Sequence, residues 1–170
     1  REQVHQMTRV LRLQAGDSLI VLDGSGTEYL VKIMSLSKEE VLCRHVDKWP
    51  SKGEPSLHIR LFQALPKSPS KFEEVLRHGT EIGVSEFYPL LTQHGEVDQL
   101  RKRERMEAIV RESAEQSERG RIPVLGPEIS LKDALHTGWP MGLEAGYTLM
   151  AHSSREPLPL LSDLLKKEPI

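Results

Sequence analysis

The side chains best suited to chemistry in this sequence are lysines and arginines, which gather in three places. The densest group is residues 101–105 (RKRER). Arg9 and Arg12 lie three residues apart among apolar neighbours, and Lys67 and Lys71 flank a Ser-Pro-Ser segment. Such cations bind phosphate groups when they stand free at a protein surface. Each place is therefore a candidate contact with an anionic ligand.

Each of these groups also has an explanation that needs no ligand. Residues 101–105 are best explained as the solvated start of a helix, with Glu104, Glu107 and Glu112 neutralising the positive charge. A plain surface pair and an ordinary polar loop remain equally open for the other two groups. The net charge of −2 gives the whole molecule no basic field, so any nucleic-acid site must be a local patch.

Other kinds of site are disfavoured by spacing. The 7 histidines show no HExxH or CxxC pattern, so we predict no metal. Gly24-Ser25-Gly26 joins two β-rich runs and opens no helix, which indicates a hairpin turn and not a phosphate-binding loop. The single cysteine, Cys43, excludes an internal disulfide, and no apolar run approaches a membrane span. A reducing, cytoplasmic location fits these features, and the chain shows no signal peptide.

The elements that must position these side chains fall into two domains. Three β-rich runs, 18–22, 28–34 and 41–46, are separated by turn residues and predict a small antiparallel barrel or meander. Residues 49–55 (WPSKGEP) have the composition of a linker. We therefore predict a β-barrel domain over residues 1–52 and a second domain over residues 53–170.

The second domain alternates between strand and helix patterns. Strands are expected at 57–65, 85–91, 122–125 and 147–151, and helices at 71–82, 100–117, 131–136 and 158–167. This alternation predicts an α/β fold with a mainly parallel sheet. The expected inward-facing residues of the first two helices are Phe72, Val75, Leu76, Gly79, Ile82, Met106, Ile109, Val110 and Ala114.

Several ordered motifs carry a resemblance to a known family. They are VHQMTRVLRLQAGDSLIVLDGSGTEY at 4–29, QALPK at 63–67, TEIGVSEFYPL at 80–90, AEQSERGRIPVL at 114–125 and LMAHSSREPLPLL at 149–161. The sequence resembles the RsmE-like family, the 16S ribosomal RNA uracil-N3 methyltransferases. The resemblance implies a PUA-like RNA-binding barrel followed by a SPOUT-type domain, whose chain forms a knot around S-adenosylmethionine. It also implies a homodimeric enzyme acting on the small ribosomal subunit in the cytoplasm.

The resemblance assigns roles to particular residues of this chain. Arg119 is the expected catalytic residue, placed to hold a phosphate or a uracil oxygen with its planar charged group. Leu149 and His152 are expected near the methyl donor. The residues expected to contact RNA are Arg9, Arg12, Lys67, Gln116 and Arg119.

The sequence also departs from the family pattern. His78 and His94 stand where the family commonly has lysine and arginine, and histidine is mostly neutral at pH 7. The family's Gly-Pro-Glu-Gly-Gly knot motif is not found, since Gly126-Pro127-Glu128 is followed by Ile129 and Ser130. We therefore expect the chain to stop short of the knot segment and to bind the donor weakly at most. A non-catalytic RNA-binding or interaction fragment, and a related enzyme acting on another nucleotide, are the alternatives.

Overall fold

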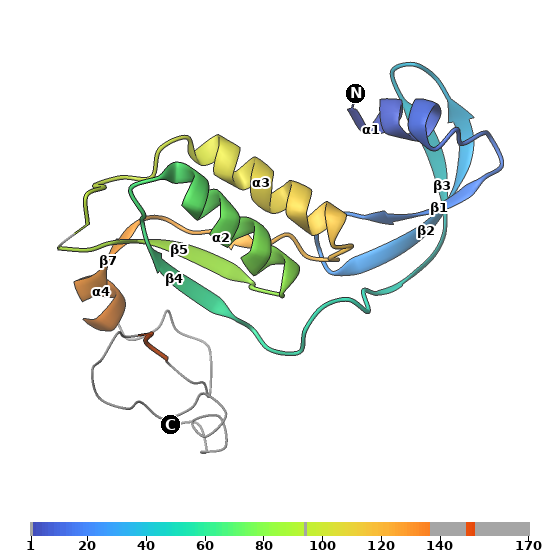
Figure 1. Ribbon diagram of the computed structural model, residues 1–170. Helices are drawn as coiled ribbons and strands as arrows, with labels where there is room; N and C mark the ends of the chain where they lie inside the picture. Colours follow the sequence, from blue (N-terminus) through green and yellow to red (C-terminus); the bar gives the residue numbers. More distant parts are fainter. Residues whose placement is uncertain (1, 94, 137–148, 152–170) are drawn as a thin grey trace. The chain divides into compact units, whose positions relative to one another are not determined.

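The computed structural model describes residues 2–93, 95–136 and 149–151 (Figure 1). The chain forms two compact units, Arg1–Leu131 and Lys132–Ile170. No described helix is long and apolar enough to cross a membrane. The predicted domain boundary after residue 52 remains a prediction.

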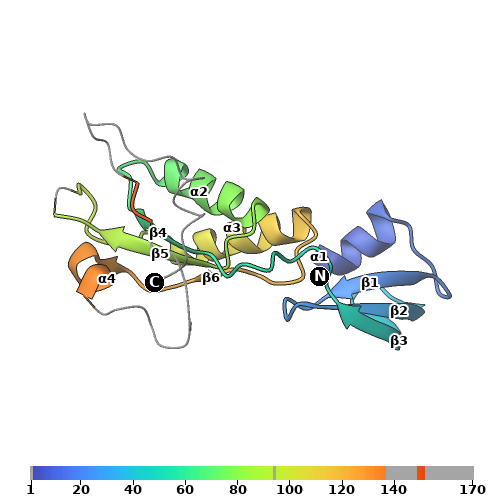
Figure 2. The same ribbon diagram turned by 90° about the horizontal axis from the view of Figure 1, so that it is seen from below.

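The N-terminal part of the first unit begins with two short helices and continues as a three-stranded antiparallel meander (Figure 2). The helices are α1 (Glu2–His5) and the π-helix η1 (Gln6–Val10); the strands are β1 (Ser18–Leu22), β2 (Thr27–Leu36) and β3 (Val41–Pro50). Gly24 and Gly26 adopt φ angles of 82° and 90° in the turn between β1 and β2, as a tight hairpin requires. Val31 and Ile33 are the buried residues of β2.

The linker predicted at 49–55 is partly wrong, because β3 continues through Trp49 and Pro50. Trp49 pairs in register with Glu28, and its Nε1 donates a hydrogen bond of 2.7 Å to the Glu28 carboxylate. Cross-strand pairing thus overrides the turn-like composition of this segment. The described residues form an open meander, one of the two arrangements that the sequence predicted.

The rest of the unit is α/β, in the order β4 (Arg60–Ala64), α2 (Pro69–Glu81), β5 (Glu86–Leu91), α3 (Arg103–Gln116), β6 (Val124–Leu125) and β7 (Ile129–Ser130). Strand β5 is central: β4 pairs along one edge, and β6 and β7 pair one after the other with β5. All these pairings are parallel, as predicted. Helices α2 and α3 pack against each other over the sheet (Figure 1).

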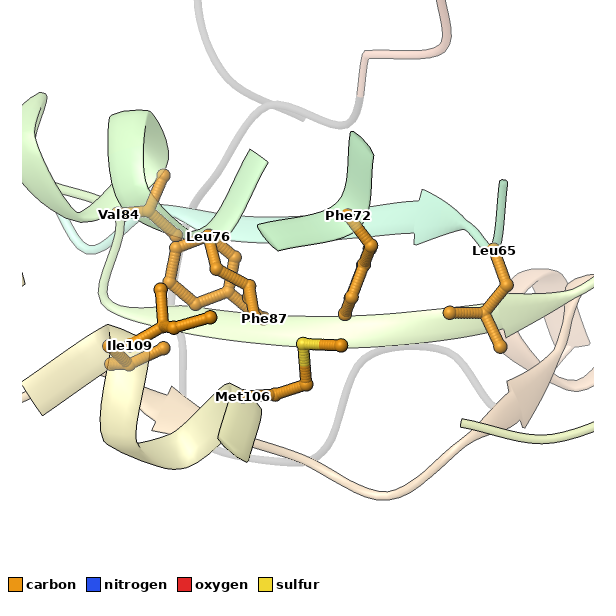
Figure 3. Packing of buried hydrophobic residues seen from close by; sticks show 8 residues of the cluster. Leu65, Phe72, Leu76, Val84, Phe87, Met106 and Ile109 are labelled. Carbon is orange, nitrogen blue, oxygen red and sulfur yellow. The ribbon is translucent and has the colours of Figure 1, made fainter. Parts of the chain in front are cut away.

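The main hydrophobic core lies between these two helices and β5 (Figure 3). Phe72 and Leu76 of α2, Phe87 of β5 and Met106 of α3 are at most 1% exposed. Burial of each such side chain stabilises the fold by about 1.5–3 kcal/mol. A side chain at Gly79 would overlap the Phe87 ring, so glycine allows the close approach of α2 to the sheet. The inward face predicted for α3 is confirmed throughout: Met106, Ile109, Val110 and Ala114 are buried.

Several expected element ends are wrong for local reasons. Leu57 is 71% exposed, because β4 begins only at Arg60, opposite the start of β5. Ile82 is 76% exposed, because α2 ends at Glu81 and the turn at Gly83 (φ 100°) brings Val84 into the core instead. Strand β6 is limited to Val124 and Leu125, and its ladder with β5 is made by the Val124 and Gly126 N–H groups, which donate to the carbonyls of Ser85 and Phe87.

Few predictions beyond β7 are tested by the described residues. Helix α4 (Leu131–His136) forms where it was predicted. Leu149–Ala151 is not a strand, so the end of the strand predicted at 147–151 is wrong. Residues 147–148 and the helix predicted at 158–167 lie outside the described residues.

Candidate binding site at the carboxyl ends of the strands

A hollow of about 260 Å³ opens where β4 and β5 end. The segment after β4 supplies Leu65, Pro66 and Lys67, and the segment after β5 supplies residues 96, 97 and 99–101. Parallel strands carry their carboxyl ends at one edge of the sheet, which is where open α/β folds bind ligands. The topology alone therefore makes this hollow the first candidate site.

Two helices begin beside the hollow because each follows one of the strands. Pro69 of α2 and Met106 of α3 both contribute to its wall. Proline at the first position of α2 sets the backbone angle of a helix start. Lys102 caps α3 in the left-handed conformation (φ 55°), and neither helix has a side-chain hydrogen bond at its cap. The positive ends of two helix dipoles thus lie near the opening.

Charged groups stand at the rim and apolar groups form the floor. Lys67 Nζ lies 2.7 Å from Glu96 Oε2, and these side chains are 80% and 63% exposed. Arg101 also lines the hollow, and no carboxylate in the described part of the chain pairs with it. Leu65, Phe72, Val97, Leu100 and Met106 line the same space.

In the basic run 101–105, some side chains are paired with acceptors of the protein and others are not. Arg103 donates to the carbonyls of Leu125 (3.1 Å) and Gly126 (3.0 Å) and pairs with Glu128 (3.2 Å). Arg105 donates twice to Glu73 of α2, at 2.7 and 2.9 Å. The neutralisation predicted from within the helix is weaker: Arg103 lies 3.7 Å from Glu107, and the pKa of Arg105 is raised mainly by Glu73 and to a smaller extent by Glu112. Neighbouring elements supply the better carboxylates.

The Gly126-Pro127-Glu128 turn separates β6 from β7 and holds one wall of the hollow. Glu128 accepts a hydrogen bond of 3.0 Å from the Leu100 N–H and another from Arg103. Hydrogen bonds from its own backbone N–H and from Leu100, together with Arg103, lower the pKa of Glu128. A side chain at Gly126 would overlap the Tyr88 ring. The turn therefore has a structural role, which supports the distinction from the knot motif.

Arg119, the expected catalytic residue, is buried away from the hollow and 6% exposed. Its Nη1 donates to the carbonyls of Val84 (2.6 Å) and Thr80 (3.2 Å), and its Nη2 donates to Glu54 (2.8 Å). Glu54 also accepts from the Arg121 N–H at 2.9 Å. The catalytic and RNA-contact roles predicted for Arg119 find no support in these surroundings, which assign it to the internal framework.

The other expected contact residues do not come together with Lys67. Gln116 is exposed at the last position of α3, and the roughly 20 Å length of a 14-residue helix separates it from the hollow at the first turn. Arg9 and Arg12 are exposed near η1, Arg12 with a φ of 52°. His78 is exposed on α2 and lies 3.1 Å from Glu81.

The expected donor residues are the least defined. Leu149 is 50% exposed and belongs to no strand, while His152 and His94 lie outside the described residues. Among the residues that the structure describes, no group of three potential metal ligands is present. Sequence reasoning considered Glu128 only as part of a Gly-Pro-Glu motif and had not singled out Glu54 or Glu96, because a carboxylate in a loop carries no signal of its future partner.

Comparison with known proteins supplies the biological context. A family model described as an RNA methyltransferase domain matches residues 53–168, and one described as an RNA methyltransferase PUA domain matches residues 1–44. Ribosomal RNA small subunit methyltransferase E of Synechocystis is 40% identical over 122 residues, which are 71% of this chain and 39% of that protein. The Bacillus subtilis protein of the same name is 32% identical over 127 residues, 72% of this chain and 49% of that protein. The chain therefore spans half or less of these relatives.

Solved structures agree with this relationship. A probable rRNA-methyltransferase from Porphyromonas gingivalis matches with a TM-score of 0.71 and 26% identity, covering 79% of this chain and 56% of the other. A ribosomal RNA small subunit methyltransferase E from Neisseria gonorrhoeae, solved with S-adenosyl methionine, shares the fold at a TM-score of 0.68 and 23% identity, over 78% and 56% of the two chains. The resemblance to RsmE-like proteins and the PUA-plus-SPOUT fold expected from it are confirmed, and the chain belongs to the RNA methyltransferase family.

Proposed function

We propose that this protein methylates uracil N3 in the 16S RNA of the small ribosomal subunit, with S-adenosylmethionine as donor. The observation that carries the proposal is the Lys67 hollow at the carboxyl ends of β4 and β5, within a region matched by an RNA methyltransferase domain. The names of the Synechocystis and Bacillus subtilis relatives support the substrate. Two structural neighbours bound to S-adenosylmethionine support the donor. A cytoplasmic homodimer completes the proposal.

The chemistry of this reaction sets two demands on the chain. N3 lies on the Watson–Crick edge of uracil, so the base must leave its stack before it can react. Proteins recognise such unstacked nucleotides by combining cations for the backbone with apolar surface for the base or sugar. The hollow offers Lys67 and Arg101 at its rim and apolar side chains beneath them. Arg9 and Arg12, exposed in the PUA-like region, are the proposed second contact with RNA.

Leu149 is half exposed, lies outside any strand and does not line the hollow, and His152 lies outside the described residues. We therefore derive no reaction step through the donor. What these residues can do is bind the RNA and hold one nucleotide in place, and such positioning supplies much of the rate enhancement in group transfer.

Methyl transfer onto small ribosomal subunits tests this function directly. The protein encoded by its complete gene would be incubated with donor labelled in the methyl group and with subunits from a strain that lacks this modification. We expect label in 16S RNA as 3-methyluridine, identified by nuclease digestion and mass spectrometry. Label on another nucleotide would favour a related enzyme. RNA binding without label would favour the alternative of a non-catalytic RNA-binding or interaction fragment.

A further inference from the structure

We infer that Lys67 and Arg101 together bind one RNA phosphate at the rim of the hollow. In the absence of RNA, Glu96 forms an ion pair with Lys67, and the phosphate replaces Glu96 as the partner of Lys67. This inference rests on the proposed function, since it takes RNA as the ligand. It adds a residue, Arg101, and a competing carboxylate, Glu96, that no resemblance assigned. The sugar or base of the same nucleotide then lies against the apolar floor.

Arg101 is distinguished from the rest of its basic run by its partners. Arg103 is tied to two carbonyls and to Glu128, and Arg105 is tied to Glu73. Lys102 does not line the hollow. Arg101 is exposed, lines the hollow, and has no carboxylate partner among the described residues. It is therefore the member of the run whose charge is available to a ligand in this space.

The two walls of the hollow come from separate segments of the chain. Lys67 follows β4 and Arg101 lies in the segment after β5, so a group bound by both would bridge these two segments. The Glu128 carboxylate holds the Leu100 N–H at 3.0 Å, which fixes the backbone next to Arg101. A planar guanidinium and a flexible ammonium that line one hollow from separate segments suit a phosphate with several acceptor oxygens.

The floor and the volume favour a nucleotide over a bare anion. Besides the cations, the hollow is lined by the apolar side chains of Leu65, Phe72, Val97, Leu100 and Met106. A volume of about 260 Å³ approaches the lower end of small-molecule sites, roughly 300 Å³. An inorganic phosphate would leave the apolar part of this space unused.

Glu96 behaves as an internal substitute for the phosphate. Its Oε2 lies 2.7 Å from Lys67 Nζ, and both side chains remain largely exposed. Exposed ion pairs of this kind are weak, at most about 1 kcal/mol. A phosphate that also reaches Arg101 can therefore displace Glu96 at little cost. Glu96 therefore competes with the phosphate for Lys67 and modestly weakens RNA binding.

The salt dependence of RNA binding tests the two cations. Affinity of the 170-residue chain for a fluorescent single-stranded oligouridylate of about 12 nucleotides would be measured over a range of salt concentrations, with folding checked by circular dichroism. Each phosphate contact contributes about 0.7 to the slope of log affinity against log salt. Because both cations hold one phosphate, we expect Arg101→Ala and Lys67→Ala each to weaken binding, and the double substitution to reduce the slope by about 0.7 in total. Arg111→Ala, an exposed α3 arginine outside the hollow, should leave it unchanged. Equal effects of all three variants, or no effect of Arg101→Ala, would overturn the inference.

Glu96→Gln tests independently whether Glu96 competes with RNA for Lys67. The substitution should strengthen binding about two- to fivefold, the range set by an exposed ion pair. In a Lys67→Ala background the same substitution should have no effect, because the competition no longer exists. An equal gain in both backgrounds would show a general charge effect and would remove Glu96 from the site.

These results separate the inference from the function on which it rests. If methyl transfer occurs but Arg101→Ala binds RNA like the original chain, the inference fails and the function stands. If binding depends on Arg101 and Lys67 while no methyl group is transferred to RNA, the function fails and the site stands.

Discussion

Two cation–carboxylate pairs of nearly equal length have opposite surroundings in this molecule. Arg119 and Glu54 lie 2.8 Å apart with side chains 5% and 16% exposed. Lys67 and Glu96 lie 2.7 Å apart with side chains 80% and 63% exposed. Family resemblance assigned both cations to RNA contact. The structure separates them, since the first pair is largely buried and the second pair lines the open hollow.

The comparison teaches that surroundings, and not pair distance, decide what a charged side chain can do. The Arg119 guanidinium also donates hydrogen bonds to two carbonyls. Both of its Nη atoms therefore bind acceptors within the protein. Removing one partner of a buried pair leaves a charge without compensation and costs about 3–5 kcal/mol. Exposed pairs contribute about 0–1 kcal/mol, because water replaces the lost partner.

The largest expected effect is therefore on folding. Glu54→Ala leaves Arg119 buried without its carboxylate, and we expect the free energy of unfolding to fall by about 3 kcal/mol. Urea titration followed by circular dichroism measures this change. Glu96→Ala is the matched control and should stay within about 0.5 kcal/mol of the original chain. Equal losses of unfolding free energy in the two variants would contradict the claim that the buried pair contributes more to stability than the exposed pair.

Arg103 provides an intermediate case, because its side chain is 34% exposed and its partner Glu128 is 28% exposed. Arg103→Ala removes hydrogen bonds to two carbonyls and a carboxylate. Hydrogen bonds involving charged groups contribute about 1.5–3 kcal/mol, so we expect a loss of about 2 kcal/mol with some compensation by water. Arg111→Ala serves as control in the same urea titration. A loss below about 0.5 kcal/mol would place Arg103 with the exposed pairs.

The pH dependence of the unfolding free energy should also report on the buried Arg119–Glu54 pair, without removal of a side chain. Burial raises the pKa of Glu54, but hydrogen bonds from Arg119 and the Arg121 N–H outweigh burial and bring the pKa below its usual value of 4.5. A carboxyl group with a lowered folded pKa contributes stability above its unfolded pKa and loses it as pH falls through the folded pKa. Unfolding free energy should therefore decrease as pH falls below 4.5, and less steeply in Glu54→Gln. Glu86 and Glu128 also have lowered pKa values, so only the difference between the two curves reports on Glu54. Parallel curves would contradict this account.

The sequence predicted the architecture better than the pairing of side chains. Periodicity placed Met106, Ile109, Val110 and Ala114 in the core, because helical spacing repeats along one chain segment. It could not place Glu54 beside Arg119, since the two are 65 positions apart and meet only after the chain folds. Motif resemblance pointed to Lys67 as a candidate contact but not to Arg101. An arginine in a basic run is indistinguishable from its neighbours until those neighbours find carboxylates.

The smallest expected effect concerns His78, where the family resemblance leads us to expect a lysine. His78 Nδ1 lies 3.1 Å from Glu81, and these side chains are 69% and 45% exposed. A lysine at position 78 would add a charge next to that carboxylate, which would offset much of its attraction for RNA. We therefore expect His78→Lys to strengthen oligouridylate binding at pH 7.5 by less than about twofold, an energy below about 0.4 kcal/mol.

Substitution of Glu81 shows whether this carboxylate limits the effect of His78→Lys. In a Glu81→Gln background the neutralising carboxylate is gone, so His78→Lys should strengthen binding more than it does alone. The comparison is made in the same salt titration, with Arg77→Lys as a charge-conserving control on the neighbouring exposed position of α2. A gain of tenfold for His78→Lys alone would show that position 78 contacts RNA despite Glu81. The RNA surface would then extend along α2, beyond the hollow bounded by Lys67 and Arg101.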